Sequence, residues 1–468
     1  MKTRILSLIL TIALLLPAYA GCKSEPAADF GEPSGVTAQT DASNEKEPNY
    51  PATDYSDFVM PEETDSLTIY GYSFYDDTLR RALDLFQRRY PDVKIDYQLL
   101  GEDEYMTRLR AEIPAGQGPD VLIGNSSVLP DIYKTMSTGI FTDCAPYMAN
   151  DPEYCPEDYY DGVVKGGAMF GKQYLFPITF GIGCLLTTRN LLEENGISPD
   201  SLADWNGFLS ACIGYHENNP GKRLFNIGSS DNLCYISELF SRCGFHLIDY
   251  EKNAVSFDED RFREMVDLCR LYCFPTVPED LVWGGGSLNL RDRECLFVSE
   301  TTSKLSLILN DCYLIVDEVR EEPILLCVPD ENGGISANIV TFAAIPRASQ
   351  NKLNAWHFIK ILLSDEIQAE PQKSGWLGTA FGVGNPVRKE SLRRMADSFL
   401  NQFYPGMDKI AEVYLGTADC IVDAVMLPPV VEKYVKDSMI PYIKSKDGSN
   451  YEKQIEKLKS TLELYKDE

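Results

Sequence analysis

One stretch, residues 171–190, constrains the fold of this chain more than any other. It opens with a polar turn, reaches Pro177 inside an apolar run and continues as a β-type run over residues 178–188. Proline has no backbone N–H to donate to a central ladder, so it marks a sheet edge or a crossing of the chain. We expect the chain to leave one lobe and enter another here, because a strand that crosses between lobes forms a hinge beside a cleft.

Length and charge narrow the classes of protein that remain. With 468 residues the chain exceeds what one ordinary hydrophobic core holds, so two lobes are expected. Its 71 acidic and 43 basic residues give a formal net charge of -28. A field of that sign repels phosphate backbones and anionic lipid surfaces. We therefore expect no nucleic-acid partner and no membrane contact through the folded body.

The first residues indicate export. Lys2 and Arg4 precede an apolar run over residues 5–16, which is too short to span a bilayer and typical of a signal peptide. The sequence Tyr19-Ala20-Gly21-Cys22 that follows resembles a bacterial lipobox, in which Cys22 is lipidated. Ordinary secretory cleavage near Cys22 is the alternative. We predict a signal peptide over residues 1–21 and a protein held on the extracellular face of the cell membrane by a lipid on Cys22.

Residues 22–65 are predicted to form a lipid anchor and a disordered linker, and an α/β body follows. The linker is rich in Pro, Ser, Glu, Asp and Thr and holds too little apolar surface to fold. A strand at 67–72, a helix capped by Asp76 or Asp77 and a strand at 93–99 make a βαβ unit with a parallel sheet. Residues 119–123 form a third strand. Ligands bind beyond the carboxyl ends of such strands. The candidate ligand-binding residues there are Tyr72, Ser73, Asn125 and Ser126.

The order of several short motifs identifies a family. The motifs occupy residues 86–93, 118–121, 139–143, 171–177 and 355–368, with Trp205 at a helix start. In this order they resemble the extracellular solute-binding proteins of ABC importers, family 1, and the sugar-binding type most closely. The resemblance covers residues 66–468.

The resemblance implies an α/β, two-lobed periplasmic-binding-protein-like fold of type II, with hinged lobes and a ligand cleft. Lobe 1 would hold residues 66–177 and 335–415, and lobe 2 would hold residues 178–334 and 416–468. The chain would cross between lobes near residues 178, 334 and 416, and the proline-bearing stretch 426–429 matches a crossing beside the ligand. The implied protein is a monomer that delivers a carbohydrate to ABC permease subunits and is not an enzyme.

The second lobe supplies further candidates. Trp283 precedes three glycines, which indicate either an aromatic platform on a cleft loop or an ordinary flexible loop. Ser299 and Glu300, with Thr301, stand where the family has a short strand running to the cleft. Trp376 follows the helix at 355–363. Aromatic rings stack on the apolar faces of sugars and carboxylates accept from their hydroxyls. Packing of Trp283 and Trp376 inside their own lobes is the alternative.

Other chemistries find little support in the sequence. The three histidines lack HExxH spacing, Gly181 and Gly183 lack a third glycine, and no nucleophile elbow is complete. We therefore expect no metal, no cofactor and no catalytic residue. A secreted glycan-active hydrolase and a sensor or scaffold lipoprotein on the same fold remain the alternatives. Of the 13 cysteines, Cys144 and Cys155 could bridge a short loop. We favour buried thiols, because a chain of this length has a core without disulfides.

Overall fold

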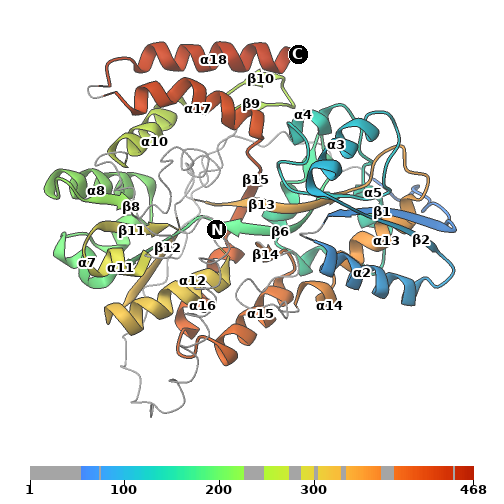
Figure 1. Ribbon diagram of the computed structural model, residues 1–468, viewed down its shortest axis with the longest axis horizontal. Coiled ribbons are helices and arrows are strands. Elements are labelled where there is room, and N and C mark those ends of the chain that lie inside the picture. The colour runs from blue at the N-terminus through green and yellow to red at the C-terminus, as the bar shows by residue number, and fades with distance from the viewer. Residues whose placement is uncertain are drawn as a thin grey trace, which may run out of the picture. The chain divides into compact units, whose positions relative to one another are not determined.

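The computed structural model describes residues 54–72, 75–225, 247–272, 286–299, 304–327, 334–369, 384–445 and 448–468 (Figure 1). All of these ranges fall within one compact unit, Gly35–Glu468. The predicted signal peptide, Cys22 and most of the predicted linker lie outside the described residues. None of the described helices combines the length and the apolar character needed to span a bilayer.

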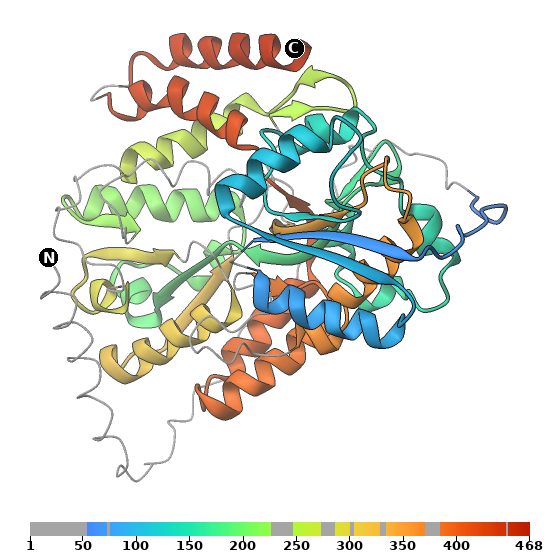
Figure 2. The ribbon, with the colours of Figure 1, turned by 45° about the vertical axis from the view of Figure 1, so that its right-hand side comes forward.

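The predicted βαβ unit is confirmed. Strands β1 (Ser66–Tyr72) and β2 (Lys94–Leu100) pair in parallel, and α2 (Asp76–Arg89) connects them (Figure 2). A parallel bridge between Ile69 and Val121 joins β1 to the start of β3 (Leu122–Gly124), which α3 (Glu102–Glu112) precedes. The alternating apolar residues of the strands and the apolar stripe of α2 are the local signals that the chain follows here.

The predicted cap of α2 is wrong. The residue at the N-cap position is Tyr75, and Asp76 lies in the first helical turn. The Asp76 carboxylate accepts a hydrogen bond of 2.6 Å from the Tyr97 hydroxyl on β2 and pairs with Arg80 at 3.0 Å. The Asp76 side chain, which the sequence predicts as a helix cap, therefore binds Tyr97 on the neighbouring strand instead.

The predicted linker is too long at its carboxyl end. Residues 54–65 contain no helix or strand, but Phe58 and Met60 pack against the core. The Phe58 ring lies 5.2 Å from the Tyr147 ring, and the Asn354 amide donates to the Thr64 carbonyl at 2.9 Å. Two apolar side chains in a polar segment are enough to hold these residues on the body.

The larger sheet has the strand order β14-β6-β13-β15, with β3 paired to β13 outside that path. Its strands are β6 (Phe176–Ile182), β13 (Ile335–Ala344), β14 (Asn385–Pro386) and β15 (Ile421–Val425). Strand β14 reaches only Thr179 and Phe180 of β6. Pro177 lies beyond it, where β6 is an edge on that side, as the proline indicated.

A second sheet has the order β12-β7-β11-β8. Its strands are β7 (Cys184–Thr188), β8 (Arg223–Phe225), β11 (Cys295–Ser299) and β12 (Pro323–Cys327). The chain leaves the larger sheet at Ile182 and enters the second sheet at Cys184, so Gly183 is the first connection. It returns between Cys327 and Ile335, the second connection. The sequence placed the first crossing near 178, whereas strand pairing keeps residues 176–182 in one sheet.

The described chain also contains further α-helices and short strands. The helices are α4 (Ile132–Ser137), α5 (Ala145–Asn150), α6 (Asp161–Lys165), α7 (Arg189–Glu194), α8 (Trp205–Asn218), α10 (Glu259–Tyr272), α11 (Gly286–Arg291), α12 (Leu305–Leu314), α13 (Lys352–Leu362), α14 (Asp365–Gln368), α15 (Lys389–Gln402), α16 (Asp408–Asp419), α17 (Pro429–Ile443) and α18 (Tyr451–Asp467). Short strands are β4 (Ala168–Met169), β5 (Lys172–Gln173), β9 (Ile248–Asp249) and β10 (Ala254–Val255).

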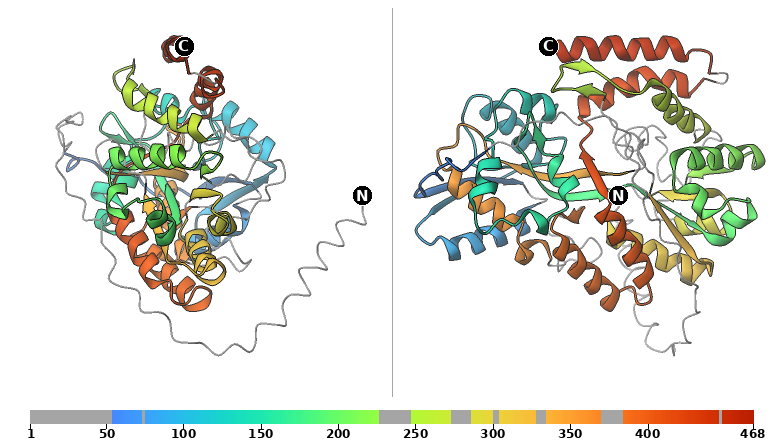
Figure 3. Two further views of the ribbon diagram at one scale, coloured as in Figure 1. Left: turned by 90° about the vertical axis from the view of Figure 1, so that its left-hand side faces the viewer. Right: turned by 180° about the vertical axis from the view of Figure 1, so that it is seen from behind.

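The closing helix has the core face that its periodicity predicts. Tyr451, Ile455, Leu458, Leu462 and Tyr465 of α18 are all buried. They pack α18 against α17, and the two helices lie side by side in both views of Figure 3. The cysteine expectation holds only in part: Cys144 is buried, but Cys155 is exposed, and neither forms a disulfide.

Candidate functional site

Two strands of the larger sheet end facing each other. Strand β13 pairs with β6 along one edge, so β3 and β15 share its other edge. Strand β3 runs antiparallel to β13 beside residues 342–344, and β15 runs parallel to it beside residues 335–338. Because the two directions are opposite, the carboxyl ends of β3 and β15 meet across residues 339–341. We call this place the strand gap.

The loop after β3 brings Asn125 and Ser126 to the strand gap. Gly124 has to be glycine, because a Cβ there would lie 2.2 Å from a methyl group of Val128. Asn125 is half-buried, and its Oδ1 accepts from the Ser127 N–H at 2.9 Å. The Arg110 guanidinium of α3 donates to the Ser127 carbonyl at 2.8 Å and to the Val128 carbonyl at 3.1 Å. Helix α3 therefore fixes the conformation of this loop through Arg110.

The loop after β15 is tied to the first one. The Met426 N–H donates to the Tyr133 hydroxyl at 2.9 Å, and Tyr133 belongs to α4, which follows the β3 loop. Burial raises the pKa of Tyr133 above its ordinary value, so the phenol stays protonated. Helix α6 covers β15 closely: a Cβ on Gly162 would lie 2.3 Å from the Ile421 carbonyl oxygen. The predicted stretch 426–429 thus leaves the sheet at the strand gap.

Several buried polar atoms beside the strand gap have no hydrogen-bond partner in the described part of the chain. They are Ser336 Oγ, Asn338 Oδ1 and Thr341 Oγ1 on β13 and Thr179 Oγ1 on β6. Asn338 lies between Gly181 of β6 and Val425 of β15. A buried polar group without a partner costs about 1–3 kcal/mol. A ligand that offers hydrogen bonds at this place would recover that cost.

A buried asparagine holds the first connection. Asn385 of β14 is fully buried, and its amide donates to the Phe180 carbonyl at 3.1 Å and to the Tyr414 hydroxyl at 2.7 Å. Its Oδ1 accepts from the Leu305 N–H at the start of α12, at 3.0 Å. Lys304, the residue before, is buried, and burial lowers the pKa of its ammonium group to about 8. Asn385 and Lys304 were not predicted, because neither stands in a motif.

The structure places the sequence-predicted residues in three groups. Tyr72 ends β1 opposite Leu100, so it reaches the same sheet edge as Asn125 and Ser126; only its backbone is described. The backbone of Ser299 ends β11 opposite Leu185, one residue past the start of β7. The others lie outside the described residues: Ser73, Trp283, Glu300, Thr301, Trp376 and Cys22. Their assignment stays a prediction.

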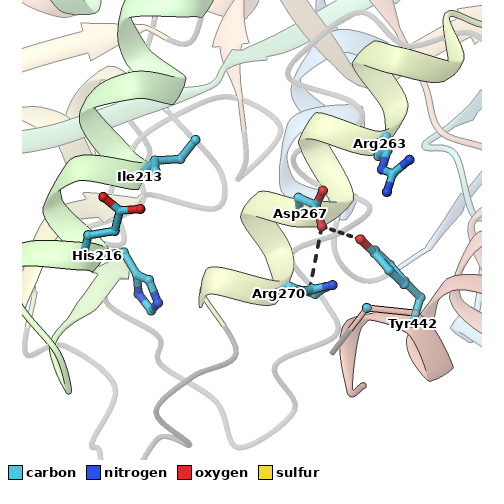
Figure 4. A pocket seen from close by; sticks show the side chains of 8 residues that line it. Ile213, His216, Arg263, Asp267, Arg270 and Tyr442 are labelled. Atoms are coloured by element: carbon cyan, nitrogen blue, oxygen red, sulfur yellow. Dashed lines mark hydrogen bonds and ion pairs between the residues drawn. The ribbon is translucent and has the colours of Figure 1, made fainter. Parts of the chain in front are cut away.

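A pocket of about 360 Å³ lies elsewhere, between α8, α10 and α17 (Figure 4). Its lining residues are Ile213, His216, Glu217, Arg263, Asp267, Arg270, Tyr442 and Gly448. The Asp267 carboxylate accepts from the Tyr442 hydroxyl at 2.5 Å and lies 3.7 Å from Arg270. Three of its polar side chains thus already bind one another, and no sequence-predicted site residue is among the residues that line it.

Both the sequence and the fold of this chain are similar to those of known proteins. Residues 68–242 match the family model of the bacterial extracellular solute-binding proteins. The fold resembles the sugar-binding protein MalE of Xanthomonas citri, with 16% identity, a TM-score of 0.63 and coverage of 86% of this chain and 97% of that one. Over residues 68–242 the chain is therefore similar to the bacterial extracellular solute-binding proteins. Its type II periplasmic-binding-protein fold, expected from the motifs, is confirmed.

Two further solved structures resemble this chain in fold. A family 1 extracellular solute-binding protein of Alicyclobacillus acidocaldarius shares 15% identity with a TM-score of 0.57, covering 86% of this chain and 100% of that one. A cyclic alpha-maltosyl-1,6-maltose binding protein of Arthrobacter globiformis shares 16% identity with a TM-score of 0.56, covering 85% and 99%. At these identities the likeness shows the fold alone. The matched family and these neighbours are binding proteins.

Proposed function

We propose that this solute-binding protein captures a sugar or oligosaccharide at the strand gap and delivers it to the permease subunits of an ABC importer. The observation that carries the proposal is the convergence of β3 and β15 beside buried polar atoms of β13 that have no hydrogen-bond partner among the described residues. In proteins with open α/β sheets, ligands bind beyond the carboxyl ends of the strands, and two such ends meet at the strand gap. Two structural neighbours, a sugar-binding protein and a cyclic alpha-maltosyl-1,6-maltose binding protein, support the solute class.

The chemistry of the strand gap favours a neutral, hydroxyl-rich solute. Ser336 and Thr341 offer hydroxyl groups, which both donate and accept, and Asn338 offers a carbonyl oxygen that accepts. Sugar hydroxyls can match all three. An anionic solute would meet the field of a chain with a net charge of -28, which opposes its approach. The predicted aromatic platforms Trp283 and Trp376 and the predicted acceptor Glu300 would complete such a site.

A screen of thermal stability with sugars, oligosaccharides, peptides and polyamines tests the solute class. A ligand that binds only the folded state raises the melting temperature. We expect a sugar or oligosaccharide to do so and peptides and polyamines to have no effect. Stabilisation by a peptide or polyamine alone would contradict the proposal. Release of shortened glycans on incubation would instead favour the hydrolase alternative.

A matched pair of variants tests the strand gap. Thr341→Val removes one hydroxyl without changing the shape of the side chain, and we expect it to weaken binding about fivefold, since one neutral hydrogen bond is worth ~1 kcal/mol. Thr187→Val is the control, because Thr187 is equally buried and its hydroxyl has no partner in the described part of the chain, but it lies on β7 in the second sheet. Equal affinities for the two variants in calorimetry would move the site away from β13.

The membrane attachment is proposed separately. Cys22 would carry the lipid and the residues before 54 would act as a spacer, so that the monomeric body stands clear of the membrane. Cys22→Ser should release the protein into the medium. Recovery of the variant in the membrane fraction would remove the lipoprotein proposal. Sugar binding by the unmodified parent protein without any transport would favour the sensor alternative.

A further inference from the structure

Two cysteines lie opposite each other where the chain passes between the sheets. Cys184 is the first residue of β7, directly after the first connection, and Cys327 is the last residue of β12, directly before the second connection. The antiparallel register pairs them, and their sulfur atoms lie 3.6 Å apart in a shared S–H···S hydrogen bond. The other described cysteines form no second pair of this kind.

The backbone geometry already suits a bond between the two sulfurs. Directly opposite residues of antiparallel strands have Cα atoms ~4.5–5.5 Å apart, within the range that disulfides span. The sulfurs need to approach by roughly 1.5 Å to reach a bond of about 2.05 Å. Rotation of two side chains accounts for a movement of that size, so no strand has to shift.

The two thiols also differ in access to solvent. Cys184 is fully buried, whereas Cys327 is half-buried. The phenol of Tyr414 is a near neighbour: burial, and then these two thiols, raise its pKa well above the ordinary value. Asn385 holds that phenol in turn. A reagent in solution therefore reaches Cys327 first, and Cys184 stands ready behind it.

We propose that Cys184 and Cys327 form a reversible disulfide site that ties together the two connections between the sheets. The oxidant is a small disulfide such as oxidised glutathione. The Cys327 thiolate attacks one of its sulfurs, forms a mixed disulfide and releases one glutathione thiolate. The Cys184 thiolate then attacks the Cys327 sulfur and releases the second glutathione. The protein loses two electrons and two protons, and one oxidised glutathione becomes two thiols.

Peptide mapping of the full-length protein tests the site. After treatment of the folded, reduced protein with oxidised glutathione, we expect one linked peptide pair, Cys184 with Cys327, that a reductant opens again. It should form at least ~10-fold faster in the folded chain than in urea, because the sheet holds the sulfurs together. Equal rates of pairing in the folded chain and in urea would overturn the proposal. It would also fail if Cys184 and Cys327 remain reactive to an alkylating reagent while the exposed Cys155 and Cys420 take up glutathione.

Two serine variants sharpen the result. In Cys184→Ser the mixed disulfide on Cys327 has no second thiol to resolve it, so glutathione should remain attached there. Cys295→Ser is the matched control, because Cys295 is a buried thiol of the same sheet, on β11, and the linked pair should form as in the parent. If Cys184→Ser fails to fold, Cys327→Ser serves instead, and it should leave Cys184 unmodified. Loss of the linked pair in the Cys295 variant would also contradict the assignment.

Discussion

At the scale of single residues, the first connection depends on one amide. Asn385 joins β14 to β6, α12 and α16 through three hydrogen bonds, and all of its polar atoms are buried. An asparagine is suited to this position because it donates and accepts at the same time. Asn385 thus holds the end of the larger sheet that adjoins Gly183, through partners that are distant from it in sequence.

Replacing Asn385 should destabilise the fold. Asn385→Leu keeps the volume but removes the three buried hydrogen bonds of the amide, and each such loss costs ~1–3 kcal/mol. We expect a loss of about 3 kcal/mol or more in the free energy of unfolding, measured by urea denaturation. Asn310→Leu is the control, because the two hydrogen bonds of Asn310 are long, 3.4 and 3.5 Å. Similar losses in the free energy of unfolding for both variants would show that the hydrogen bonds of Asn385 contribute no more to stability than those of Asn310.

At the scale of elements, Asp131 ties α4 to two later segments. It caps α4, and its carboxylate accepts from the hydroxyls of Tyr250, which follows β9, and of Tyr465 on α18, the latter at 3.0 Å. Lys134 of the same helix donates to the Tyr465 carbonyl at 2.7 Å. One buried carboxylate therefore joins three parts of the chain, and the two tyrosines lie 119 and 334 residues from it in sequence.

Removing both tyrosine hydroxyls should loosen this junction. Each hydrogen bond to a charged group is worth ~1.5–3 kcal/mol, so Tyr250→Phe with Tyr465→Phe should lower the free energy of unfolding by at least about 2 kcal/mol. Tyr434→Phe on α17 is the control, since within the described residues its hydroxyl forms no hydrogen bond. Hydrogen exchange should report faster opening of α18 in the double variant. Unchanged exchange would contradict a role for Asp131 in docking that helix.

The pKa of the Asp151 carboxylate predicts how acid changes the stability of the contact with α13, the helix that carries Trp356 and Lys360. Burial alone would raise the pKa of Asp151, but hydrogen bonds from Lys360, from the Glu153 N–H and from Trp356 outweigh it and lower the pKa below its usual value of 3.8. The carboxylate lies 2.7 Å from the Lys360 ammonium. Since the folded pKa is the lower one, the stabilisation is present above pH 3.8 and is lost as the pH falls through the folded value.

Asp151→Asn should remove that pH dependence. We expect the variant to be less stable by about 2 kcal/mol at neutral pH. The difference in the free energy of unfolding should shrink as the pH falls from 5 to below 3.8. Asp161→Asn is the control, because Asp161 pairs with Lys165 on the exposed surface and should change little at any pH. A constant difference across the pH range would rule out the ion pair as the cause.

At the scale of the whole molecule, two sheets joined by paired connections predict hinged movement. The first connection passes from β6 to β7 and the second from β12 to β13, and the strands that they join lie next to each other within each sheet. A solute that contacts residues of both sheets, such as Asn125 and Ser299, would favour a closed arrangement. The predicted lobe bounds stay a prediction.

Small-angle scattering measures that movement. With saturating solute from the thermal screen, the radius of gyration should fall, because closure brings the two sheets together. The same solute added to a variant that no longer binds it provides the control. An unchanged profile at saturation would mean that the solute binds without closure.

The sequence by itself determined the elements whose signals are local. Alternating apolar residues over 93–99 predicted β2, the apolar stripe of α18 predicted its buried face, and the run over 171–190 predicted a passage between two bodies. These patterns arise because each strand or helix has to bury one face, and that requirement is written in neighbouring residues.

Only the tertiary structure decided which strand ends meet and which side chains join them. Gly124, Asn338 and Val425 are brought to one place by the opposite directions of β3 and β15 along β13. Asp76 binds Tyr97 instead of capping its helix, and Asn385 finds partners on three elements. Contacts of this kind depend on strand order and direction. Those are set by the packing of the whole chain, because a hydrogen bond forms wherever folding brings a donor to an acceptor, whatever their separation in sequence.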